Sequence, residues 1–171
     1  MKKANFLAFA LGATALLGAS QAWAATQSVT ANIAFDTPLT LTKTADINFG
    51  TETAANASTY HITTANVVTT TVGTGAHLYG ATNAGSITIA GPAADTLTIS
   101  VGGYTAYNGV TPSNASCAYN GGAQVTPCTY AAAVAPGAGK TLLVGVDVAA
   151  DGTQAGGTTA APTFTISVAY Q

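Results

Sequence analysis

Short stretches of alternating apolar and polar residues, separated by glycine, proline and asparagine, dominate this sequence of 171 residues. A period of two places every second side chain on one face of a β-strand, whereas an amphipathic helix needs a period of 3.6 residues. No stretch of the sequence offers a convincing apolar stripe at the helical period. The sequence therefore predicts an all-β protein, and the turn signals between many short strands favour an Ig-like antiparallel β-sandwich.

The N-terminal alternation runs from Ser28 to Leu41, with Val29, Ala31, Ile33 and Phe35 on one face. It predicts one long strand, or two strands broken at 36–38, because the proline at position 38 cannot donate to a β-ladder. Further strands are expected where β-branched residues cluster between turn signals. These ranges are 67–72, 86–89, 96–101, 125–134, 142–148 and 164–170.

The first 24 residues have the three parts of a secretory signal peptide. Lys2 and Lys3 give a basic start, residues 6–17 give an apolar run, and Ala22-Trp23-Ala24 gives a cleavage site with small flanking residues. The apolar run is shorter than the roughly 20 residues needed to span a bilayer as a helix. We therefore expect 1–24 to be removed and 25–171 to form one domain without a transmembrane helix. Such a protein would be exported, to the periplasm, cell surface or medium of a bacterium, most naturally a Gram-negative one.

Charge is scarce, at 6% of residues. The expected mature part keeps only Lys43 and Lys140 as cations, against six carboxylates in the sequence. Nucleic acids and anionic lipid surfaces need clustered cations, so neither is an expected partner. Weak charge also leaves little electrostatic repulsion between copies, which favours self-association.

The two cysteines, Cys117 and Cys128, lie in a turn-rich segment. Because exported proteins fold where thiols are oxidised, we expect these two to form a disulfide. Their spacing does not match a CxxC redox or zinc motif.

No catalytic, cofactor or metal motif is complete. The two histidines, His61 and His77, have no nucleophile elbow such as GxSxG to act on and are expected to be exposed. The six carboxylates lack the spacing of a calcium loop or a zinc site, and Asp147 is expected to be solvated. The glycines of VAPGAGKT do not fit a phosphate-binding loop, since Val134 stands where its first glycine belongs. We therefore expect no enzyme, no cofactor and no metal ion.

The two ends of the expected mature chain carry strongly alternating segments. At the C-terminus, Phe164, Ile166, Val168 and Tyr170 share one face. Such a strand can complete the sheet of a neighbouring molecule, since its backbone supplies hydrogen bonds and every second side chain fills a pocket. Both strands could equally belong to the domain's own sheet, and the sequence does not decide between these interpretations.

The segments TPLTLTKTADINFGT (37–51) and LLVGVDVAADGTQAGGTTAAPTFTISVAYQ (142–171) resemble the two ends of the secreted bacterial domain-of-unknown-function family 4402. The family pattern usually has Gly-x-Tyr before its final strand, whereas here Gly156-Gly157 is followed by Thr158. The resemblance covers less than half of the mature chain and leaves 52–135 unassigned. The matching residues are Leu39, Leu41, Lys43, Asp46, Phe49, Gly50, Gly145, Phe164, Val168 and Tyr170.

That family is similar in turn to spore-coat-like subunits and to fimbrial subunits of the chaperone-usher kind. Those subunits have an alternating N-terminal extension, a disulfide, a glycine about fourteen residues from the end and a penultimate tyrosine; Gly157 and Tyr170 match the last two. The resemblance implies a structural subunit of a surface fibre, pilus or coat. Residues 25–35 would donate a strand to a neighbour. The implied partners are copies of itself, related subunits and a periplasmic chaperone.

Two other functions remain open at this point. A monomeric carbohydrate-binding adhesin would use tyrosine rings as stacking faces, for which Tyr104, Tyr107, Tyr119 and Tyr130 are candidates. A small outer-membrane β-barrel is allowed by the length, but such proteins usually end on an aromatic residue and this chain ends on Gln171.

Overall fold

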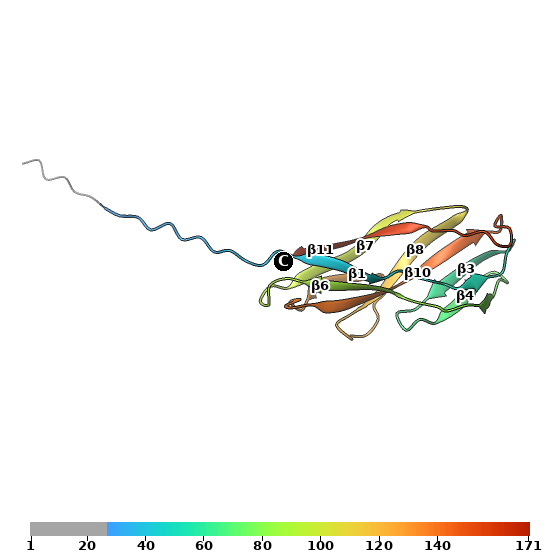
Figure 1. Ribbon diagram of the computed structural model, residues 1–171, viewed down its shortest axis with the longest axis horizontal. Helices are drawn as coiled ribbons and strands as arrows, with labels where there is room; N and C mark the ends of the chain where they lie inside the picture. The colour runs from blue at the N-terminus through green and yellow to red at the C-terminus, as the bar shows by residue number, and fades with distance from the viewer. Residues whose placement is uncertain (1–26) are drawn as a thin grey trace, which may run out of the picture. The chain divides into compact units, whose positions relative to one another are not determined.

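The computed structural model describes residues 27–171, which contain strands and no helix (Figure 1). The chain forms two units. The described residues of the first unit, 27–34, have no regular secondary structure, and the second unit, 35–171, is the folded domain. The predicted signal peptide, 1–24, lies outside the described residues. The prediction of an all-β antiparallel sandwich is confirmed.

The folded domain has eleven strands. They are β1 (Thr40–Ala45), β2 (Thr51–Glu52), β3 (Ala57–Ile62), β4 (Val68–Val72), β5 (His77–Tyr79), β6 (Gly85–Ala90), β7 (Leu97–Thr105), β8 (Val110–Tyr119), β9 (Thr129–Ala133), β10 (Lys140–Asp151) and β11 (Thr163–Tyr170).

The larger sheet is built around β10, the longest strand. Leu142 of β10 pairs with Ile87 of β6 on one side and with Tyr119 of β8 on the other. Further along, Val148 pairs with Tyr60 of β3 on the side opposite β8. Next, β1 pairs with β6 and β4 with β3, all antiparallel. One long edge of this sheet therefore consists of β1 and β4, and the other edge is β8.

A second sheet, in the order β11-β7-β9, packs against the larger one, and β2 and β5 form a short two-stranded sheet. Alternate side chains of the main sheets meet in the core, as strand geometry requires. The fully buried apolar side chains come from both sheets and from the disulfide. They include Ile62, Ile89, Leu97, Ile99, Leu142 and Val144.

Two parts of the predicted strand pattern are wrong. No strand is assigned to 27–39, so the alternation that begins at Ser28 becomes a strand only at Thr40. A β-strand forms when its backbone N–H and C=O groups pair with another strand, and this segment has no such partner within the described residues. The range 125–134 is a strand only over β9, because Pro127 interrupts it and Val125 forms just an isolated bridge with Cys117. The other five ranges overlap β4, β6, β7, β10 and β11.

The two long sides of the sandwich differ. On one side, the disulfide joins Cys117 of β8 to Cys128, directly before β9, and so connects the edges of the two sheets. On the other side, the edges are β1 and β11. Among the strands of the described domain, β1 pairs only with β6 and β11 only with β7. We call these sides the closed edge and the open edge.

Candidate assembly groove

A long groove follows the open edge between β1 and β11. Its volume is about 1300 Å³, above the roughly 300–1000 Å³ of typical small-molecule pockets. One wall is formed by β1 and the chain that follows it as far as Ala54. The other wall is the first half of β11 together with the loop 154–162 that precedes it. An extended polypeptide segment suits this elongated shape better than a compact ligand does.

The floor of the groove is formed by the part of the larger sheet that lies between the two walls. Apolar side chains from β6 and β10 line it between the two walls. Sheet edges that keep apolar side chains accessible mark interaction surfaces, because burying that area is favourable. Four lining side chains are half-buried, namely Ile47, Phe49, Ile87 and Phe164, whereas Val146 and Val148 at the floor are buried.

The C-terminal strand that the sequence singles out forms part of this groove. Phe164 and Ile166 line it, whereas Val168 and Tyr170, on the same face of β11, lie beyond its end. All four belong to a strand that pairs with β7 of its own domain, so β11 is not a free strand, although its other edge is unpaired within the described domain. Gly157 lines the opposite end of the groove in a loop, with φ of +81°.

One end of the groove is shut by Tyr170. Its hydroxyl donates to the backbone oxygen of Thr37 at 3.3 Å, which ties the end of β11 to the chain just before β1. Burial raises the pKa of the Tyr170 phenol, and the carboxylates of Asp36 and Asp95 raise it further, so the hydroxyl stays protonated and can donate. Figure 1 shows the C-terminus beside the start of β1. We call this the shut end.

The far end of the groove, the mouth, carries polar groups. Glu52 Oε1 lies 3.0 Å from Nδ1 of His77, across the β2–β5 pair. The second oxygen of the Glu52 carboxylate is buried and has no hydrogen-bond partner in the described part of the chain. Burial raises the pKa of Tyr60, and the nearby Glu52 carboxylate adds to the rise. His77 is therefore a paired residue rather than the freely exposed one that the sequence predicts.

The N-terminal residues predicted to act as a donor strand are freely available. Val29 is 90% exposed, Ile33 is 75% exposed and Phe35 is 86% exposed. Ala31 is exposed as well. Their shared face is therefore apolar and unburied, which costs free energy until another surface covers it.

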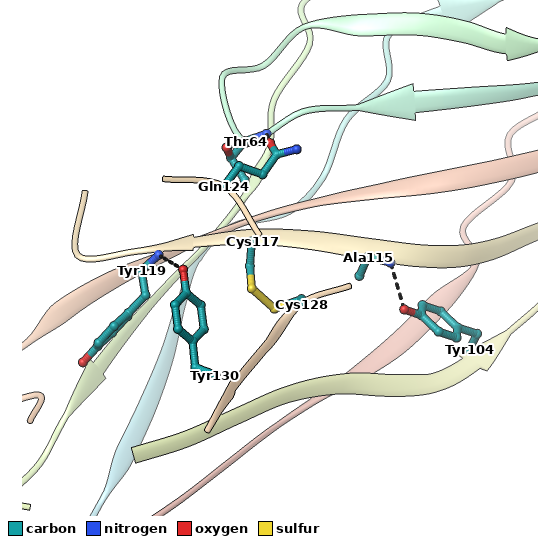
Figure 2. Close-up of a disulfide and its surroundings, with 8 residues drawn as sticks. All are labelled: Thr64, Tyr104, Ala115, Cys117, Tyr119, Gln124, Cys128 and Tyr130. Carbon is teal, nitrogen blue, oxygen red and sulfur yellow. Dashed lines mark hydrogen bonds between the residues drawn. A yellow bond between two sulfur atoms is a disulfide. The ribbon is translucent and has the colours of Figure 1, made fainter. Parts of the chain in front are cut away.

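At the closed edge, the predicted Cys117–Cys128 disulfide is confirmed (Figure 2). Tyr119 and Tyr130 pack edge-to-face beside it, and the Tyr130 hydroxyl accepts the backbone N–H of Tyr119 at 3.2 Å. Tyr119 is only 5% exposed. These rings are core residues, so the stacking surface considered for a carbohydrate-binding module is not formed by them.

Tyr104 is also held in place rather than free. Its ring packs against Phe164, and its hydroxyl accepts the backbone N–H of Ala115 at 2.9 Å. Of the four candidate tyrosines only Tyr107 is largely exposed. A single ring offers no cluster of stacking faces.

The outer face of the larger sheet holds one polar cluster that the sequence does not predict. His61 Nδ1 lies 2.5 Å from Oδ1 of Asp147, and Asn114 donates to the other carboxylate oxygen at 3.0 Å. Both members of the ion pair have side chains only 18% exposed. The expectation that His61 is exposed and Asp147 solvated is therefore wrong, because β3 and β10 pair these two side chains and leave both largely covered.

Among residues 27–171 there is no group of three or more His, Cys, Asp or Glu side chains placed to hold a metal ion. In the same range, no helix is long and apolar enough to cross a membrane. Comparison with known proteins finds no matching family model, no matching curated protein and no matching solved structure.

Proposed function

We propose that this protein is the structural subunit of a bacterial surface fibre, pilus or coat, in which the segment 27–35 of one copy enters the groove of the next. The observation that carries the proposal is the pairing of two incomplete parts in one chain. The groove lacks a strand between β1 and β11, and the N-terminal segment is an alternating apolar strand without a partner. Strand addition satisfies both, because the free edge supplies backbone hydrogen bonds and the floor receives every second side chain.

Nine residues of extended chain span about 30 Å. On the β11 side, the groove runs along the first half of that strand and along the loop 154–162 before it. The groove wall on the other side runs from Leu41 to Ala54. The four inward side chains of the segment, Val29, Ala31, Ile33 and Phe35, would pack against the apolar side chains of the floor.

The direction of insertion decides what kind of assembly forms. The segment is joined to its own domain at the shut end, through 36–38. If it lies antiparallel to β11 of a neighbour, Phe35 reaches that neighbour's mouth and Val29 points towards the shut end. The donating domain then sits beyond the mouth with its own groove still free. Repetition gives an open head-to-tail fibre.

Insertion in the reverse direction would instead let the segment turn at 36–38 and pair with β1 of its own domain. Among the described strands β1 pairs only with β6. We propose donation to a second copy rather than self-pairing. A domain with an open groove needs protection before assembly, and a periplasmic chaperone is the partner that we propose for that step.

The resemblance to secreted family 4402 and to fimbrial subunits supports the same proposal. Several residues that carry it lie around the groove, among them Leu41, Phe49 and Phe164 as lining residues and Tyr170 at the shut end. Export to the cell surface remains part of the proposal, supported by the N-terminal sequence and by the disulfide.

The test is assembly of the mature chain, 25–171. Purified protein should form a ladder of multimers that survives detergent at room temperature and collapses to monomer on heating, with fibres visible by electron microscopy. Excess peptide 27–35 should shorten the ladder, whereas the same peptide with Ile33→Asp should not. A chain that stays monomeric at high concentration and ignores the peptide would refute the proposal.

A further inference from the structure

We propose that Lys43, held in place by Asp46, selects the strand that can fill the groove: it faces Ala31 of the incoming copy and rejects a larger side chain at that position. This inference rests on the proposed strand donation, and it adds the contact that fixes the register of the inserted strand.

Lys43 stands on the inner face of an edge strand, where a charged side chain is unusual. It pairs with Ile87 across β1 and β6, and directly opposed residues of antiparallel strands point to the same face. Ile87 in turn pairs with the fully buried Leu142 of β10, so this face is the one that meets the core. Lys43 therefore projects towards the groove, which it lines.

The ammonium group of Lys43 is paired but not buried. Its Nζ lies 2.6 Å from Oδ1 of Asp46, which also lines the groove, and the two side chains are 64% and 78% exposed. An ion pair with this exposure adds little to the stability of a domain. After position 24 the sequence has only one other cation, Lys140. The fold of the monomer therefore does not explain a rare cation at this inward position.

An inward lysine limits which strands can add to the edge. A large aliphatic side chain placed against the Lys43–Asp46 pair removes water from both charges, and an apolar partner does not repay that cost. A methyl group is too short to cover the pair, and it leaves room for the methylene stem of the lysine to lie along the inserted strand with its ammonium in water. Natural edge strands use inward charges to prevent unselective pairing. The residue that faces Lys43 should therefore be small.

The donor segment has one small residue on its inward face. Of the four inward side chains only that of Ala31 ends at Cβ, since the others are β-branched or aromatic. With Ala31 beside Lys43, Val29 lies beside Leu41, which precedes Lys43 on the same face and also lines the groove. The two remaining inward side chains then continue towards the mouth over the apolar lining.

This arrangement fixes the register, which an apolar alternation alone does poorly. Sliding the strand by two residues keeps the same face inward. Either slide brings a β-branched side chain, Val29 or Ile33, against Lys43. The slide that brings Ile33 there also drives the segment towards the shut end, where Tyr170 is bonded to the chain before β1. Only one register therefore leaves the ion pair in water and the strand inside the groove.

The experiment measures peptide binding to the full mature chain carrying Ile33→Asp, which keeps every residue of the groove but cannot donate. Fluorescence anisotropy compares three peptides spanning 27–38. They are the natural sequence, Ala31→Leu, and Ala34→Leu as the same enlargement on the opposite face.

Each peptide is titrated against three acceptors. The first is the chain just described, the second adds Lys43→Ala, and the third adds Lys140→Ala as the matched loss of a lysine that does not line the groove. Thermal melts of the three acceptors check that each is folded, which is expected for Lys43→Ala because the side chain is largely exposed.

The Ala31→Leu peptide should bind the unaltered groove about tenfold more weakly than the natural peptide, as overpacking of a filled site does. The Ala34→Leu peptide should bind within about twofold of the natural one, because its changed side chain faces solvent. On the Lys43→Ala acceptor the penalty for Ala31→Leu should shrink at least about threefold, since the two changes act on one shared contact. Lys140→Ala should leave that penalty unchanged.

Equal binding of the natural and Ala31→Leu peptides, an equal penalty on the Lys43→Ala acceptor, or an equal loss with Ala34→Leu would overturn the role of Lys43 while leaving strand donation intact. If Lys43→Ala does not fold, the comparison of the three peptides on the unaltered groove decides alone. Absence of binding by every peptide on every acceptor would overturn strand donation itself, and the role of Lys43 with it.

Discussion

Ile33→Asp is the change that best separates strand donation from a structural role in the monomer. Ile33 is 75% exposed and belongs to no strand of its own domain. A substitution at such a position changes the free energy of unfolding by about 0.5 kcal/mol or less. The monomer should therefore keep its melting temperature and its yield.

The effect on assembly should be much larger. Burying the isoleucine in an apolar groove contributes about 1.5–3 kcal/mol, and an aspartate there loses this contribution and adds the cost of an unpaired charge. A combined loss of at least about 4 kcal/mol weakens each contact about a thousandfold. At concentrations where the natural chain forms long fibres, the variant should remain monomeric.

The assay is analytical ultracentrifugation together with detergent-resistant ladders and a thermal melt of the monomer. Asn32→Asp is the matched control, because it adds the same charge on the neighbouring position whose side chain would face solvent in the groove. That control should assemble normally. Normal fibres from Ile33→Asp would refute strand donation, and a lowered melting temperature of its monomer would show that the segment belongs to its own sheet.

Three further outcomes test the domain itself. Replacing Cys117 and Cys128 together by serine should lower the free energy of unfolding by about 3 kcal/mol in chemical denaturation. The unaltered protein should show no alkylation of its cysteines when it is denatured without reductant. Alkylation of both cysteines would contradict the disulfide. Gly145→Ala should destabilise the monomer by about 1–3 kcal/mol, because a Cβ there would meet the backbone oxygen of Ile62; an unchanged melting temperature would show that β10 can shift. His61→Ala should cost about 1 kcal/mol of stability through loss of its carboxylate partner on β10 and leave assembly intact, whereas loss of assembly in a folded variant would give this histidine a functional role.

The alternating pattern predicts the strands that are buried on one face. In β10, Val144, Val146 and Val148 are buried, and in β11 Phe164 and Ile166 are half-buried, as their sequence parity indicates. The disulfide follows from composition and compartment. These features are local, so a single segment of sequence contains the information.

Other features depend on contacts that no single segment reveals. The strand β8 contains Pro112 and Asn114, the latter with φ of +47°, which are residues typical of turns. It forms because β10 provides a long edge for pairing. The N-terminal alternation is as strong as that of β11, yet it forms no strand in this chain, because strand formation needs a partner and not only a pattern.

The groove shows the same limit. Ile47, Ile87 and Val146 come from three distant segments and meet only because β6 pairs with both β1 and β10. The sequence does not reveal the mouth for a similar reason, since Glu52 and Tyr60 belong to different sheets and meet only in the fold. The alternation of Ser58, Tyr60 and Ile62 indicates only that Tyr60 faces inward.

The closed edge has a mechanical consequence for a fibre assembled as proposed. Tension would enter each domain along the inserted strand and leave along β1, so the two would be pulled in opposite directions along their length. Two strands that are pulled past each other in this way separate only when many hydrogen bonds break at the same time. Such a pair resists force better than a pair whose hydrogen bonds break one after another. The disulfide lies on the opposite side of the sandwich and carries none of this load directly. Its part would be to keep β8 and β9 together as a rigid back, so that stretching the fibre is confined to the contacts between the inserted strand and the groove.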